Sequence, residues 1–296
     1  IFKSSRLNPI KNKEEMMKLI MDVAINDERI RAVTMEGSRA SKNATHDQYC
    51  DFDICYIVSD IREFTKDNKW VEIFGEILIV QYPMDWYSHP YNYAGHDNFA
   101  YLIQFKDGNR IDLTLIDVCN IDKEQGYCEP RIVLLNKDNF KELQQIDDES
   151  VFYIQKPSEM EYYNTCNEFR WLSVYISKGL CREELYYAKY AYDVLMMEMF
   201  IKMLNWKIGV DNDFNVTTGN HSKYLKRFLS LEEMKRFHSV FPNGTYEDIW
   251  SKLYVIYDYF AEIAKYVGEA LKYNFDAKET EEVRSFLSER QKQCVN

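Results

Sequence analysis

The stretch "EGSRASKNATHDQYCDFDICYIV", residues 36–58, decides the fold of the first half of the chain. It places a Gly-Ser pair ahead of two aspartates, Asp51 and Asp53, which are separated by one phenylalanine. In an extended chain the side chains of residues i and i+2 point to the same face. Residues 54–58 predict a largely buried strand. Two carboxylates at the start of such a strand repel each other, so we expect a positive partner between them.

A third acid interrupts another predicted strand. Asp112 lies in "RIDLTLID", residues 110–117, and the Asp-Gly pair of "KDGN" predicts a hairpin between this strand and residues 99–105. Three carboxylates on neighbouring strands suit one or two Mg²⁺ ions, which favour carboxylate oxygens, water and substrate phosphates. Metals held in this way assist nucleotidyl or phosphoryl transfer by activating the attacking hydroxyl and stabilising the leaving group.

The Gly-Ser pair supplies a second part of such a site. Gly37 allows close approach of the backbone, and the N–H groups with the Ser38 hydroxyl are able to hold a phosphate oxygen. Each feature alone has a simpler interpretation: a solvated D-x-D, an ordinary turn, or a structural salt bridge between Asp112 and Arg110. The joint pattern favours the metal site, because each acid otherwise places a charge beside apolar neighbours.

Composition narrows the class of protein. The 296 residues suit two domains, and the net charge of −11 disfavours nucleic acid as a partner while it favours a cationic substrate. We expect no membrane partner and a cytoplasmic location, since no run of 18 apolar residues or signal sequence is found. Seven scattered cysteines without a CxxC pair predict free thiols, with neither a disulfide nor a zinc site. The oligomeric state stays open.

The pattern of apolar residues changes along the chain. Residues 1–156 alternate helix and strand, with strands predicted at 30–36, 52–58, 76–81, 99–105 and 110–117. Residues 157–296 carry helical periodicity with few strand signals. Helix starts are predicted at residue pairs in capping positions, namely Asn12 and Glu15, Ser158 and Glu161, Ser230 and Glu233, and Thr245 and Asp248. The fold class is therefore α+β, with a mixed sheet followed by an all-helical bundle.

The pattern "MEGSR…DFDI…RIDL" resembles the nucleotidyltransferase superfamily. Further stretches, "YLIQFKDGNRIDLTLID", "CNEFRWLSVYISKGLCREEL" and "KYLKRFL", resemble the aminoglycoside 6-adenylyltransferases, which modify streptomycin. The likeness runs from about residue 12 to 290. It implies a nucleotidyltransferase domain at 1–156, a helical substrate-binding and nucleotide-binding domain at 157–296, and transfer of AMP from Mg-ATP to a streptomycin hydroxyl, the 6-OH.

Carried over by residue, the resemblance implies that Asp51, Asp53 and Asp112 bind Mg²⁺. Gly37 and Ser38 would contact the phosphates of ATP, with Arg39 close by. Asp112 is the candidate for removing the proton of the acceptor hydroxyl, since it would lie nearest the nucleophile.

The helical domain supplies further candidates. Lys178, Arg182 and Lys223 are candidates for the triphosphate, although cations near helix ends or on a solvated face are the ordinary alternative. Glu168 is placed to hold a guanidinium or ammonium group of the drug. Asp193 is a second candidate for this role, with a buried structural hydrogen bond as its alternative. We expect Trp171 in the core.

Residues 82–98 form a predicted loop that contains His89, His96, Tyr91 and Tyr93. Its aromatic content differs from that expected for a streptomycin enzyme of this family, so the acceptor is less well determined than the reaction. Two alternatives therefore stay open. One is an adenylyltransferase for another aminoglycoside or a lincosamide-like acceptor, and the other is a non-catalytic nucleotide-binding protein of the same fold.

Overall fold

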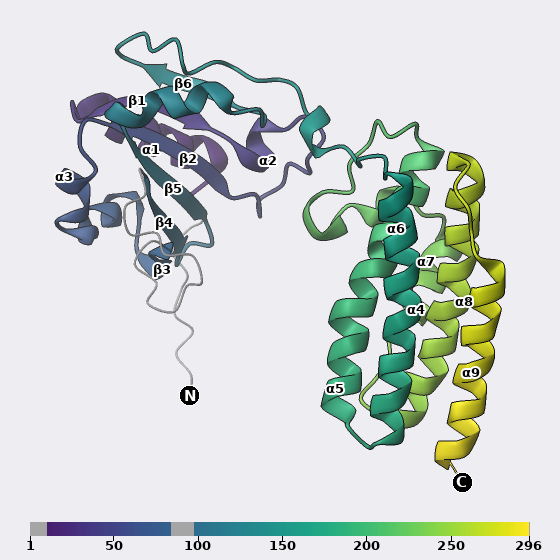
Figure 1. The fold of residues 1–296 in the computed structure, drawn as a ribbon. Coiled ribbons are helices and arrows are strands. Elements are labelled where there is room, and N and C mark those ends of the chain that lie inside the picture. The colour runs from purple at the N-terminus through teal and green to yellow at the C-terminus, as the bar shows by residue number, and fades with distance from the viewer. Residues whose placement is uncertain (1–10, 84–97, 296) are drawn as a thin grey trace, which may run out of the picture. The chain divides into compact units, whose positions relative to one another are not determined.

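The computed structural model describes residues 11–83 and 98–295. The chain forms two compact units, residues 1–151 and 152–296, each with its own hydrophobic core (Figure 1). The first unit combines a β-sheet with helices, and the described part of the second unit consists of helices and their connections. The fold class is thus α+β, as the sequence predicts.

A six-stranded mixed sheet organises the first unit, in the order β3-β4-β5-β2-β1-β6. Its strands are β1 (Ile30–Met35), β2 (Phe52–Val58), β3 (Ile77–Gln81), β4 (Asn98–Phe105), β5 (Arg110–Asp117) and β6 (Ile132–Asn136). β2 and β5 pair in parallel, and the other four neighbouring pairs are antiparallel. The β4–β5 hairpin turns at Gly108, whose φ of +94° suits glycine, so the predicted hairpin is confirmed.

Short helices surround this sheet. α1 (Lys13–Asn26) begins at the predicted capping box of Asn12 and Glu15, and its buried residues enter the same core as the strands. The Tyr56 hydroxyl of β2 donates to the Ile20 carbonyl of α1 at 2.7 Å. The remaining elements are α2 (Gly37–Ala40), α3 (Arg62–Thr65) and the 3₁₀ segments η1 (Asn68–Phe74), η3 (Val118–Gly126) and η4 (Ser150–Phe152).

The second unit is a helical bundle. Its helices are α4 (Glu159–Cys181), α5 (Leu185–Tyr190), the π-helical η5 (Ala191–Met196), α6 (Met197–Asp211), α7 (Leu231–Ser239), α8 (Tyr246–Leu271) and α9 (Ala277–Val295), with short 3₁₀ segments η6 (Asn220–Ser222) and η7 (Leu225–Arg227). The capping boxes at Ser158 and Ser230 are both formed, and Thr245 caps α8 as predicted.

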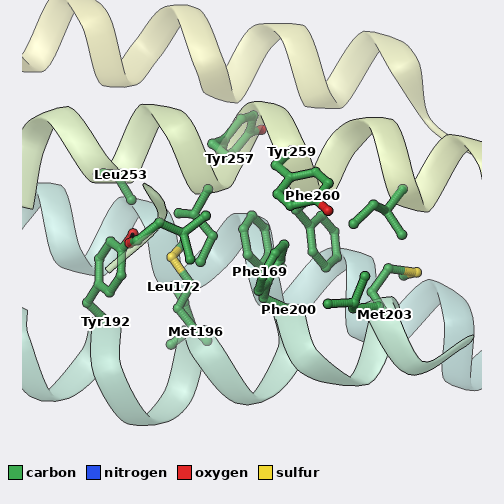
Figure 2. Packing of buried hydrophobic residues seen from close by; sticks show 14 of the residues in the cluster. Phe169, Leu172, Tyr192, Met196, Phe200, Met203, Leu253, Tyr257, Tyr259 and Phe260 are labelled. Carbon is green, nitrogen blue, oxygen red and sulfur yellow. Dashed lines mark hydrogen bonds between the residues drawn. The ribbon is translucent and has the colours of Figure 1, made fainter. Parts of the chain in front are cut away.

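Aromatic residues fill the interior of the bundle (Figure 2). The rings of Phe169 on α4 and Phe260 on α8 stack with their centroids 3.7 Å apart. Phe200 on α6 meets Tyr259 edge-on at 5.3 Å, and the buried Tyr192 hydroxyl donates to the Val240 carbonyl at 2.6 Å. The helices are therefore held by an apolar core in which the buried Tyr192 hydroxyl finds a hydrogen-bond partner.

Two sequence-based expectations about the bundle are wrong. Cys181 and Cys294 form a disulfide that joins α4 to α9, with their Cα atoms 5.1 Å apart, whereas we expected free thiols. The two cysteines are 113 residues apart, so their spacing carries no sign of the pairing. Trp171 is 58% exposed and does not lie in the core. In the part of the chain that the structure describes, no helix is long and apolar enough to cross a membrane.

Candidate active site

The parallel pairing of β2 and β5 brings the acids of two distant segments together. Asp53 and Asp112 are direct partners in this register, so their side chains leave the same face of the sheet on neighbouring strands. Asp51 precedes β2 by one residue, and its carboxylate lies 3.6 Å from the Arg110 guanidinium at the start of β5. The three predicted carboxylates are therefore gathered at the N-terminal ends of these two central strands.

Gly37 is the residue that lets the Gly-Ser turn approach these acids. Its φ is +62°, and a Cβ atom built there would lie 2.1 Å from Oδ2 of Asp53. The backbone is joined at the same point, because the Glu36 N–H donates to the Asp53 carbonyl at 2.9 Å. Both the backbone conformation and the space thus require glycine. Ser38 follows in the first turn of α2 and is partly buried.

The electrostatics of the acid site are unfavourable to a further negative charge. The pKa of Asp53 is raised to about 6, first by burial and then by the neighbouring carboxylates of Asp112 and Asp51. The Arg110 guanidinium opposes this rise. A raised pKa at a carboxylate beside two others is typical of sites that receive a cation.

Arg110 is the cation that the structure places beside the acids, where the sequence predicts Mg²⁺. Its Nε and Nη2 atoms donate to the two carboxylate oxygens of Asp112 at 2.8 Å and 2.7 Å. Its Nη1 atom lies 3.6 Å from Oδ2 of Asp51. The pairing of Asp112 with Arg110, which the sequence left open as a structural alternative, is therefore present.

Arg39 lies on the other side of Asp51 and is 8% exposed. Its Nε and Nη2 atoms donate to the carbonyls of Asp51 and Cys50 at 2.9 Å and 2.7 Å, and its guanidinium lies 3.9 Å from the centre of the Phe52 ring. Burial lowers its pKa from the ordinary value. These contacts fix the backbone that leads into Asp51, and contact of Arg39 with a nucleotide stays a prediction.

Glu149 anchors the segment 41–50 between α2 and β2, a role that the sequence analysis missed. Its carboxylate is 6% exposed and accepts from the N–H groups of Lys42 and Asn43 and from the Asn43 side chain. Burial raises the pKa of Glu149, but these hydrogen bonds and one from Ser41 outweigh burial and lower it overall. No local pattern reveals this role, because the partners lie 106 and 107 residues apart.

Glu36, directly before Gly37, belongs to a polar network that the sequence analysis also missed. Its carboxylate accepts from Nε of Arg131 at 3.2 Å and from the Tyr127 hydroxyl at 3.0 Å. Arg131 is almost fully buried, stacks on the Tyr127 ring and pairs with Glu124. Because this network holds the residue before the turn, it positions Gly37 from the β1 side.

The other candidates lie in the helical unit, and all five are exposed. They are Glu168, Lys178, Arg182, Asp193 and Lys223. Glu168 and Lys178 share one face of α4 with the exposed Trp171 and Tyr175, whose ring centroids are 5.6 Å apart.

The remaining three have local partners. Arg182 pairs with Glu184 at 2.9 Å, and Asp193 pairs with Lys189 one turn away. Lys223 lies 5.2 Å from the centre of the Tyr224 ring. Asp193 is thus not the buried hydrogen-bonding residue that the sequence left as its alternative. The predicted roles of these five side chains towards ATP and the drug stay predictions. His89, His96, Tyr91 and Tyr93 lie outside the described residues.

The donor set suits a hard divalent cation, because three carboxylates on one face provide the oxygen ligands that Mg²⁺ prefers. The close approach of Gly37 leaves one side of Asp53 lined by backbone. Within residues 11–83 and 98–295, however, no three Asp, Glu, His or Cys side chains converge in an arrangement ready to hold a metal ion. Arg110 explains the difference, since its guanidinium takes both oxygens of Asp112.

Acids paired across parallel strands beside a Gly-Ser turn, with a helical unit after the sheet, define a nucleotidyltransferase-like α+β protein. Comparison with known proteins agrees. The family model of streptomycin adenylyltransferase matches residues 10–290. The aminoglycoside 6-adenylyltransferase of Bacillus subtilis is 33% identical over 90% of this chain and 93% of its own length. That of Campylobacter jejuni is 33% identical over 90% and 91%, respectively.

A crystal structure of an aminoglycoside 6-adenyltransferase from Bacillus subtilis is also similar, with 30% identity, coverage of 95% of this chain and 99% of that chain, and a TM-score of 0.47. The match to the family model spans nearly the whole sequence. The chain therefore belongs to the streptomycin adenylyltransferase family of antibiotic-modifying enzymes, and it is a nucleotidyltransferase.

Proposed function

We propose that this protein transfers AMP from Mg-ATP to a hydroxyl of streptomycin, the 6-OH, and releases pyrophosphate. The observation that carries the proposal is the register of β2 and β5, which sets Asp53 beside Asp112 next to Gly37. The names of the related proteins support the 6-position of an aminoglycoside as the acceptor.

In this proposal Asp51, Asp53 and Asp112 hold Mg²⁺. When bound, the metal supplies charge neutralisation for the triphosphate and the leaving group. The N–H groups of the Gly37–Ser38 turn hold a phosphate oxygen, because no side chain at Gly37 blocks the backbone. The acceptor oxygen forms a bond to the α-phosphorus, the bond to the β-phosphate oxygen breaks, and pyrophosphate leaves. Asp112 is the candidate that accepts the proton of the hydroxyl.

The helical unit carries further candidate binding residues. Lys178, Arg182 and Lys223 are the candidates that bind the triphosphate, and Glu168 and Asp193 are the candidates that pair with the cationic groups of the drug. All five side chains reach solvent, so each is accessible to a ligand. The net charge of −11 favours the approach of a polycationic acceptor.

The experiment is pyrophosphate release by the purified protein with Mg-ATP, with and without streptomycin, followed by mass analysis of the drug. We expect release that depends on both the drug and Mg²⁺, and streptomycin that carries one AMP. Asp53→Asn and Asp112→Asn should each lose several orders of magnitude in turnover. Asp60→Asn is the matched control, because Asp60 pairs with Arg62 at the surface and lies outside the acid site.

The outcome divides in three ways. Normal turnover in both acid-site variants would refute the roles given to Asp53 and Asp112. Inactivity with streptomycin and release with another aminoglycoside or a lincosamide-like acceptor would replace only the acceptor. ATP binding without turnover on any acceptor of the panel would favour the non-catalytic alternative.

A further inference from the structure

Arg110 contacts more than one carboxylate of the acid site. Its guanidinium binds both oxygens of Asp112 at 2.8 Å and 2.7 Å, and it approaches Asp51 at 3.6 Å. A single cation thus contacts two of the three carboxylates.

Arg39, the other cation near the acids, makes no such contacts with their carboxylates in the described structure. Arg39 is near Asp51, but its guanidinium donates to the backbone carbonyls of Asp51 and Cys50 and lies over the Phe52 ring. The Arg110 side chain is 41% exposed, so solvent surrounds part of it and leaves it room to move. Arg110 is therefore a partly exposed counter-charge at the site, whereas Arg39 is buried and held by backbone carbonyls.

The same contacts conflict with a divalent ion on Asp112. A carboxylate oxygen that coordinates Mg²⁺ lies at about 2.0–2.1 Å from the ion, which would place the present guanidinium within a few ångströms of a double positive charge. Charges of the same sign at that distance repel strongly in a partly buried site. The ion and the present position of Arg110 therefore disfavour each other.

We propose that Arg110 is the resident counter-cation of the acid site, and that it leaves Asp112 when a divalent cation enters with the nucleotide. The inference rests on the proposed function, since it assigns the ligand of the acids to the metal–nucleotide complex. In the absence of nucleotide, Arg110 competes with the metal and weakens its binding. In the presence of nucleotide, the triphosphate offers the released guanidinium new anionic partners. Arg110 thereby makes metal binding depend on nucleotide binding.

The test measures binding of Mn²⁺, as a spectroscopic substitute for Mg²⁺, to the full-length protein by electron paramagnetic resonance. Arg110→Gln removes the charge and should bind Mn²⁺ alone about tenfold more tightly than the wild type. Arg110→Lys keeps the charge and should stay near the wild type. With a non-hydrolysable ATP analogue present, the gain in Mn²⁺ affinity should be smaller for Arg110→Gln than for the wild type.

Arg62→Gln is the matched control. Arg62 also pairs with an aspartate two residues away, through Nε and Nη2 at 2.9 Å and 2.7 Å, but its side chain is 86% exposed on another part of the unit. The substitution changes the net charge equally and should leave Mn²⁺ affinity unchanged. Circular dichroism of each variant establishes that the fold is retained.

Unchanged or weaker Mn²⁺ binding by a folded Arg110→Gln protein would overturn the proposal. Equal gains in Arg110→Gln and Arg62→Gln would also overturn it, because net charge alone would then explain the effect. Failure of the proposed function gives a different result. In that case the wild type binds no Mn²⁺ even with the ATP analogue, and Asp53→Asn behaves identically.

Discussion

Replacement of Asp53 by Asn should stabilise the metal-free first unit at neutral pH while it abolishes turnover. The pKa of Asp53 is raised from 3.8 to about 6 in the folded protein, chiefly by burial and then by Asp112 and Asp51. Between pH 4 and 6 the folded state therefore holds a proton that the unfolded state has lost. Stability falls as the pH rises through this window, and the penalty is fully present above pH 6. Asn carries no charge, so the Asp53→Asn protein does not lose stability in this way.

The magnitude follows from the shift. Two pKa units correspond to about 3 kcal/mol at 1.36 kcal/mol per unit. Because the Asp53 side chain is partly exposed and solvent screens the repulsion, we expect about 1–2 kcal/mol of this at pH 8. At pH 4 the wild-type carboxyl is protonated, so the difference between the two proteins should nearly vanish.

The assay is hydrogen exchange of the β2 amides, measured at several pH values in the presence of a chelator. This local probe is needed because a protein of two units need not unfold in one step. Asp60→Asn serves as the control of opposite sign, because the hydrogen bond from Arg62 lowers the pKa of Asp60. An Asp53→Asn protein that is less protected than the wild type at pH 8, or a difference that does not change with pH, would refute the reasoning.

Three further predictions test the frame of the site. Gly37→Ala should destroy activity because the added Cβ would collide with the Asp53 carboxylate, whereas Gly108→Ala, with positive φ but open space, should lose about 1 kcal/mol of stability and keep its activity. Glu149→Gln should free the segment 41–50, which limited proteolysis would detect as faster cleavage there together with lower turnover. Without reductant, Cys294→Ser should lower the melting temperature, because it should reduce the free energy of unfolding by up to about 4–5 kcal/mol in the chain-entropy description, and the difference should disappear in dithiothreitol.

The elements with local signals were predictable from the sequence. The capping boxes at Asn12, Ser158 and Ser230 form because the residues involved are three apart and need no tertiary partner. The strand 52–58 is buried on both sides, so its apolar run is continuous. The pairing of β2 with β5 was only inferred from the chemistry of the acids, and the structure supplies the register.

Elements that depend on distant partners were missed. β6 is an edge strand with half-buried residues, and its apolar run, residues 132–135, is too short for periodicity to separate a strand from a helix. The π-helical residues 191–196 between α5 and α6 were also not predicted, because the apolar period does not show such a change. Trp171 misled the assignment for another reason, since it is apolar in type but occupies the outward face of α4.

The residues around the acids show why the sequence pattern predicts the three carboxylates but not the contacts that Arg110 makes with them. Three carboxylates on one face destabilise a sheet, and a chain under selection for stability alone would have little reason to keep them. The protein offsets this cost with a cation on the same strand, Arg110, and with a glycine that gives Asp53 room. The first compensation is partly exposed, and the second is fixed in the backbone. In the exchange of Arg110 for a metal–nucleotide complex that we propose, the compensation of charge, and not that of space, is the one that moves.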